Sequence, residues 1–133
     1  VKRMSGSLVE INDTGSSVSI GGSSLKGYIN ATYEELQAVF GSDIGNLSSD
    51  DIIGLALPKD DKVSSEFRFD CTVRYEDNLD ADDYVKGAIY SWKTDKIPQQ
   101  IFTWNVGGYG QEAVWYAQDL LDAYRLTLTM EIA

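Results

Sequence analysis

Histidine is absent from the 133 residues of this chain. This residue is the usual general base near neutral pH, the usual activator of serine and cysteine nucleophiles, and the commonest zinc ligand. Its absence excludes Ser-His-Asp and Cys-His catalysis outright. Carboxylate-only chemistry and Mg²⁺-dependent chemistry are left open. We expect a protein that is not an enzyme and that holds no metal or other cofactor.

Cysteine and long apolar runs are also scarce. The single cysteine, Cys71, cannot form a disulfide within the chain, which favours a reducing compartment. It falls on the apolar side of an alternating segment, where cysteine usually acts as a small buried hydrophobe. No run of about 18 apolar residues is present, so we expect no transmembrane helix. Residues 1–6 are not followed by the apolar stretch of a secretory signal.

Positive charge is in short supply. The chain has 11 basic and 21 acidic side chains, for a formal net charge of −10. Such a protein is repelled by phosphate, so we expect no direct binding to nucleic acid or to a membrane. The same charge can steer association with a basic protein surface, including one built to hold nucleic acid. The alternative interpretation is that the charge serves solubility alone.

The length corresponds to one domain, which can bury a core without disulfides or metals. Residues 1–24 are rich in glycine and serine and contain two short β-type runs, 8–11 and 18–20, around a turn signal at 12–15. We interpret this part as an N-terminal β arm or hairpin that can be used to form a homo-oligomer. Residues 25–133 are then the single α+β domain.

A strand at 25–31 and a helix at 32–40 open this domain. Thr32 and Glu35 have the spacing of a capping box, in which each side chain satisfies a free backbone donor at the helix start. Apolar residues follow at helical spacing, and Gly41 marks the end of the helix. This is the clearest local signal in the chain.

The segment 63–75 alternates between apolar and polar residues along its whole length. Such alternation is typical of an antiparallel strand with one buried and one wet face. We expect Phe67 and Phe69 to be buried against the helices, and Glu66, Arg68 and Asp70 to face solvent.

The remaining segments complete the predicted fold. We expect a long loop at 42–61 with a helical turn near 48–53, an acidic loop at 76–84, strands at 87–93 and 101–106, a helix at 111–125 and a last strand at 126–132. Together these predict an α+β fold, with an antiparallel sheet of about four to six strands and two helices packed on one face. The N-terminal β arm is additional to this core.

A glycine-rich turn beside aromatic strand residues is the candidate ligand site. Glycine permits close approach of a ligand, and a helix start offers free N–H donors, so this region could hold a nucleotide. Its spacing matches neither a Walker A loop nor G-x-G-x-x-G. The alternative is a tight strand-to-helix turn beside core aromatics. The candidate residues are Tyr90, Trp92, Lys93, Trp104, Asn105, Gly107 and Gly108.

The acidic segment 76–84 is the candidate partner-binding surface. Its four aspartates, Asp77, Asp80, Asp82 and Asp83, could meet a basic partner. They do not form a calcium loop of the EF-hand type, because the glycine at the bend and the closing glutamate are missing. The alternative is a solvated hairpin loop without a function of its own.

Five short motifs occur between residues 25 and 125: Gly-Tyr-Ile-Asn-Ala-Thr at 27–32, Val-Phe-Gly at 39–41, Lys-Val-Ser-Ser-Glu-Phe at 62–67, Ala-Ile-Tyr-Ser-Trp-Lys at 88–93 and Trp-Asn-Val-Gly-Gly at 104–108. As a set they resemble the short accessory proteins of tailed phages, most of which have no assigned function. The resemblance implies a phage-encoded protein that inhibits a host factor in the host cytoplasm by stoichiometric binding, as anti-CRISPR proteins do. Two alternatives are a sponge for a nucleotide immune signal and a structural protein of a virion or oligomer.

Overall fold

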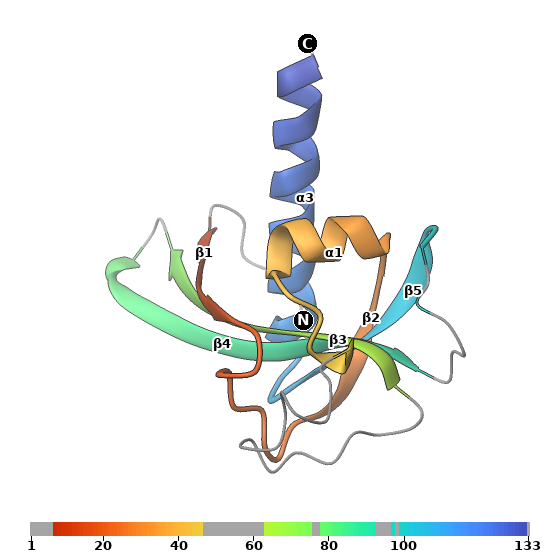
Figure 1. Ribbon diagram of the computed structural model, residues 1–133. Helices are drawn as coiled ribbons and strands as arrows, with labels where there is room; N and C mark the ends of the chain where they lie inside the picture. The colour runs from red at the N-terminus through yellow and green to blue at the C-terminus, as the bar shows by residue number, and fades with distance from the viewer. Residues whose placement is uncertain (1–6, 47–62, 76–77, 93–96, 98, 133) are drawn as a thin grey trace.

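The computed structural model describes residues 7–46, 63–75, 78–92, 97 and 99–132, and Figure 1 shows its arrangement. The predicted helical turn near 48–53 lies outside these residues. The elements in chain order are β1 (Ser7–Thr14), β2 (Ser24–Ala31), α1 (Tyr33–Phe40), the short 3-10 helix η1 (Ile44–Asn46), β3 (Val63–Tyr75), β4 (Asn78–Trp92), β5 (Phe102–Gly108) and α3 (Glu112–Ile132).

One antiparallel sheet organises these elements. Its five strands lie in the order β1-β3-β4-β5-β2, so the two strands that come first in the sequence form the two edges. Both α1 and α3 lie on one face of the sheet (Figure 1). The predicted class, an α+β fold with an antiparallel sheet and two helices on one face, is confirmed.

The central strand β3 provides the core, as its alternation predicts. Phe67 and Phe69 are fully buried on the face that carries the helices. The ring of Phe69 lies 5.3 Å from that of Phe40 in α1, and the ring of Phe67 packs edge-on against Tyr33 of α1 and Trp104 of β5. A slip of one residue would expose this apolar set, so the register of β3 is strongly determined.

The capping box of α1 is present as predicted. The hydroxyl of Thr32 accepts a hydrogen bond from the backbone N–H of Glu35, and the Glu35 carboxylate accepts one from the backbone N–H of Thr32 at 2.9 Å. The same carboxylate also accepts a hydrogen bond from Arg125 of α3, with Nη2 and Oε1 3.0 Å apart. These bonds, with that to Arg125 the strongest, lower the pKa of Glu35 from 4.5 to about 2. The box therefore also ties the two helices together.

The predicted final strand at 126–132 is wrong, because α3 continues through it to Ile132. No glycine or proline interrupts residues 112–132, so nothing in the sequence ends the helix after Arg125. The hydroxyls of Thr127 and Thr129 each donate a hydrogen bond of 3.0 Å to the backbone carbonyl four residues earlier in the helix. The alternation of apolar residues is thus carried on a helix, and Figure 1 shows the C-terminal end of α3 standing clear of the sheet.

The predicted acidic loop at 76–84 is also wrong for most of its length. Strand β4 begins at Asn78 and pairs with β3, so the expected strand at 87–93 is the second half of a longer one. Arg74 lies opposite Asp82, and the register shifts between Arg74 and Tyr75. The long partner strand β3 supplies backbone hydrogen bonds that outweigh the poor strand propensity of aspartate. The expected strand at 101–106 is β5, from Phe102 to Gly108.

The N-terminal strand exists, but its predicted hairpin partner at 18–20 is not a strand. Instead β1 pairs with β3 along its length, and Val9 and Ile11 join the hydrophobic core. Burial of these apolar side chains against the main sheet explains the choice of partner. The chain then continues toward β2 past the face of the sheet opposite the helices, where Val18 is buried.

Candidate functional site

The face of the sheet opposite the helices, termed the helix-free face below, carries the candidate site. Strand residues alternate between two faces, so residues next to the buried Phe67 and Ile89 point away from the helices. Cross-strand pairing places Glu66 beside Tyr90, and Ala88 beside Gly107. Four residues from β3, β4 and β5 thereby become neighbours on this face.

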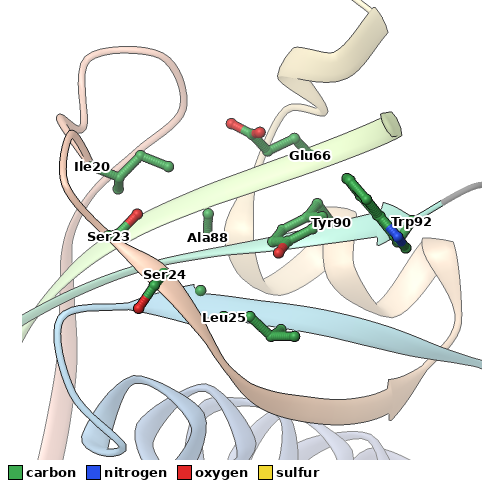
Figure 2. A pocket seen from close by; sticks show the side chains of 9 residues that line it. Ile20, Ser23, Ser24, Leu25, Glu66, Ala88, Tyr90 and Trp92 are labelled. Atoms are coloured by element: carbon green, nitrogen blue, oxygen red, sulfur yellow. The ribbon is translucent and has the colours of Figure 1, made fainter. Parts of the chain in front are cut away.

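A pocket of about 230 Å³ opens on the helix-free face. Figure 2 shows the aromatic rings of Tyr90 and Trp92 at one end and Ser23 and Ser24 toward the other, with the carboxylate of Glu66 above its own strand, β3. The lining residues are Ile20, Ser23, Ser24, Leu25, Glu66, Ala88, Tyr90, Trp92 and Gly107. Most of the wall is apolar or aromatic, with one carboxylate, as in sites that bind through a few fixed polar groups.

The two aromatic residues form a corner. Tyr90 and Trp92 are two positions apart on β4, so both point to the helix-free face. Their ring centroids are 6.2 Å apart and their planes meet at 78°. Trp92 is 39% exposed, although it lies in a strand of the central part of the sheet. The corner offers ring surface to an incoming group.

The carboxylate of Glu66 is held in place by Arg68. The Nε of Arg68 donates to Oε2 of Glu66 at 2.6 Å, and Nη1 of Arg68 donates to the carbonyl of Val18 at 3.2 Å. The side chains of Arg68 and Glu66 are 12% and 20% exposed. The alternation predicts that this face is exposed to solvent. The structure differs, because the segment after β1 covers Arg68. The second oxygen of Glu66, Oε1, has no hydrogen-bond partner among the described residues.

The residues of the predicted ligand site are divided between the two faces. Tyr90, Trp92, Asn105 and Gly107 are on the helix-free face, and all but Asn105 line the pocket. Lys93 lies outside the described residues. Adjacent strand residues point to opposite faces of the sheet. In each of the pairs 104–105 and 107–108, therefore, only one of the two residues can belong to a given face.

Trp104 and Gly108 belong to the helix-covered face. Trp104 is fully buried, and its indole Nε1 donates to the carbonyl of Ala31 at 2.9 Å. A Cβ added to Gly108 would lie 2.5 Å from Cβ of Ala113 in α3. Gly108 therefore serves close packing of β5 against the start of α3. For these two residues the structure agrees with the alternative of a tight turn beside core aromatics.

Several pocket residues were missed by the sequence analysis. Glu66 and Ala88 occupy alternating positions that place them beside Tyr90, so strand pairing could have found them. Ile20, Ser23 and Leu25 come from the segment before and at the start of β2. No local pattern in that glycine- and serine-rich stretch indicates which part of the sheet it contacts.

The acidic candidate surface is described only in part. Asp83 is exposed, and its carboxylate accepts a hydrogen bond from the Tyr75 hydroxyl at 2.8 Å. Hydrogen bonding between Tyr75 and Tyr116, burial and the Asp83 carboxylate together raise the pKa of Tyr75. The side chains of Asp77, Asp80 and Asp82 lie outside the described residues. Within the described ranges, no group of three or more histidine, cysteine, aspartate or glutamate residues could hold a metal ion.

Cys71 is not placed for chemistry. It is fully buried, and its Sγ donates to the carbonyl of Val85 at 3.4 Å. Burial, with a contribution from the charge of Asp70, raises the pKa of Cys71 to about 12. The thiolate is the nucleophilic form, so this thiol is inert near neutral pH.

None of the helices in the described part of the chain is both long and apolar enough to cross a membrane. Comparisons of the chain with protein families, with curated proteins and with solved structures gave no match.

Proposed function

We propose that this chain is a non-catalytic binding protein that engages a basic protein surface through the helix-free face of its sheet. The observation that carries the proposal is the pocket between Glu66 and the Tyr90–Trp92 corner. Aromatic residues are enriched at the centres of protein interfaces, where a polar rim surrounds a desolvated anchor. The opposite face is covered by α1 and α3, whose side chains pack into the core there (Figure 1).

The charge of the protein supports a basic partner. A net charge of −10 attracts cationic surfaces at long range and accelerates encounter, most strongly at low salt. The resemblance to phage accessory proteins suggests that this partner is a host factor and that binding inhibits it in the host cytoplasm. The inert Cys71 and the absence of histidine are consistent with stoichiometric binding.

A nucleotide ligand is the second candidate, favoured by the flat ring surfaces of Tyr90 and Trp92. Phosphate groups need cations or free N–H donors. Among the described residues that line the pocket there is no lysine or arginine, and the charged one is Glu66. The pocket chemistry therefore favours a cationic group over a phosphate. An oligomer built through the N-terminal arm gains no specific support, since β1 is paired with β3 of its own chain.

The proposal is tested by capture of partners from a bacterial lysate on the immobilised protein, at low and at moderate salt. We expect Trp92→Ser to lose the captured partner, because it removes the exposed aromatic of the pocket. Leu126→Ser is the matched control, since Leu126 is 62% exposed on α3, away from this face. Equal capture by both variants, or capture that does not weaken with salt, would contradict the proposal.

A further inference from the structure

We infer that the pocket on the helix-free face receives an arginine side chain of the protein partner. This inference rests on the proposed function, because it names the group that the partner inserts. The pocket volume of about 230 Å³ suits one long side chain rather than a folded segment. Its mixture of apolar wall, aromatic corner and single carboxylate fits a group with an apolar stem and a flat cationic head.

The apolar wall accounts for the stem. Ile20, Leu25 and Ala88 line the pocket together with the backbone at Gly107. A Cβ added to Gly107 would lie 3.5 Å from the Ser24 carbonyl oxygen and 3.6 Å from Cε1 of Tyr90, so the glycine leaves space beside both. Long cationic side chains bury their methylene groups along such surfaces and keep the charged end at a polar group.

The aromatic corner and the carboxylate account for the head. A guanidinium group stacks on aromatic rings and is attracted by their negative faces, and Tyr90 and Trp92 present two rings at 78°. Arg68 already holds Oε2 of Glu66 at 2.6 Å. The other oxygen, Oε1, can therefore accept a charge-assisted hydrogen bond from the guanidinium group without displacing Arg68. The ion pair with Arg68 orients the carboxylate before the ligand arrives.

The choice of arginine over lysine follows from the same geometry. Arg68 already neutralises part of the Glu66 charge, so the pocket offers limited compensation for stripping water from a strongly hydrated ammonium group. A guanidinium group is more weakly hydrated, is planar and stacks on rings. The hydroxyls of Ser23 and Ser24 lie toward the other end of the pocket, beside the path of the stem.

The experiment is a titration of the ¹⁵N-labelled full chain with N-acetyl-arginine methylamide, followed by NMR. The matching lysine and citrulline compounds serve as comparators, since citrulline has the shape of arginine without its charge. We expect the indole signal of Trp92, assigned with Trp92→Phe, to shift with arginine. Citrulline should bind about tenfold more weakly, the loss expected for one charge-assisted hydrogen bond.

Three variants locate the effect. Glu66→Gln removes the acceptor charge and should weaken arginine binding about tenfold towards the citrulline level, whereas Glu34→Gln removes the same charge from an exposed position on α1 and should not. If Glu66→Gln fails to fold, Gly107→Ala still tests the inference. The added Cβ lies at ordinary contact distances from its neighbours, so the fold can accept it, but it narrows the pocket and should weaken arginine binding at least severalfold.

The outcomes separate this inference from the proposed function. Equal shifts with the citrulline or lysine compound would overturn the arginine assignment. AMP is titrated in parallel as a nucleotide probe, and shifts with AMP but none with arginine would also overturn it. No shift with arginine, while Trp92→Ser still abolishes partner capture, would overturn the assignment but leave the proposed function intact. No shift with arginine, together with unchanged partner capture by Trp92→Ser, would contradict both the arginine assignment and the proposed function.

Discussion

The two faces of the central strands differ more than their sequence suggests. On the helix-covered face, Phe67 and Phe69 of β3 are fully buried among the rings of α1 and β5. One position away, Arg68 and Glu66 are also largely covered, but by a loop segment and by each other. The first face is closed by dense apolar packing, and the second keeps an open pocket.

This difference shows what each kind of covering allows. Helices with apolar stripes leave no room between themselves and the sheet, since protein interiors pack as densely as organic crystals. The segment between β1 and β2 contacts the other face through Val18 and its carbonyl, and leaves neighbouring strand residues accessible. A binding surface is therefore expected where the covering is a loop and the strand residues beneath are aromatic.

The largest expected effect is on the helix-covered face. Phe67→Ala or Phe69→Ala removes a fully buried ring, so each should cost about 3–5 kcal/mol of unfolding free energy. Urea denaturation followed by tryptophan fluorescence measures the loss. A cost below that of Arg68→Ala would mean that the two faces have been assigned the wrong way round.

The adjacent glycines of β5 compare the two faces directly. Gly108→Ala places a Cβ 2.5 Å from Ala113, so β5 and α3 must separate, at about 1–3 kcal/mol. Gly107→Ala adds the same atom on the helix-free face at 3.5 Å or more from its neighbours, and should change stability by less than about 0.5 kcal/mol. Thermal melts of the two variants suffice. Equal losses would show that the pocket is closed at Gly107.

Arg68→Ala tests how much the covering of the helix-free face matters. It removes the ion pair to Glu66 and the hydrogen bond to Val18, both partly shielded from water, and should cost about 1–2 kcal/mol. Arg74→Ala is the control on the same strand face, where the side chain is exposed, and should cost under about 1 kcal/mol. If the two costs are the same in urea melts, the segment after β1 does not shield Arg68.

The smallest effect concerns pH and the tie between the helices. The folded pKa of Glu35, about 2, is below its ordinary value of 4.5, so its ionised form stabilises the fold. This contribution is complete above pH 4.5 and is lost as the pH falls towards 2. Glu35→Gln should be less stable than the parent by about 1 kcal/mol at neutral pH, with the gap closing in acid. A gap independent of pH would show that Glu35 acts by packing alone.

Sequence predicted the fold best where local and tertiary preferences agree. The capping box at Thr32 and the alternation around Phe67 each match the environment that packing gives them, and both were confirmed. The segment 126–132 alternates like a strand, but it continues a helix that has no stop signal, and the helix prevailed. Residues 78–84 became strand because β3 offered a long partner.

The candidate site was predicted only in part. Its aromatic corner, Tyr90 and Trp92, was identified, but Trp104 was placed with them although it points to the other face. The carboxylate of Glu66 was missed, since strand order brings β3 beside β4 and no local pattern states that order. The contacts of the segment before β2 depend on the path that this segment takes over the sheet, and the sequence alone does not specify that path.

The indole signals of Trp92 and Trp104 test the central claim most directly, because the two residues lie on opposite faces of the same sheet. Both N–H signals can be followed in one titration of the labelled chain with N-acetyl-arginine methylamide. The account predicts a progressive, saturable shift of the Trp92 signal, while that of Trp104, bonded to the Ala31 carbonyl, stays in place. A shift of Trp104 without Trp92, or no shift of either, would contradict it.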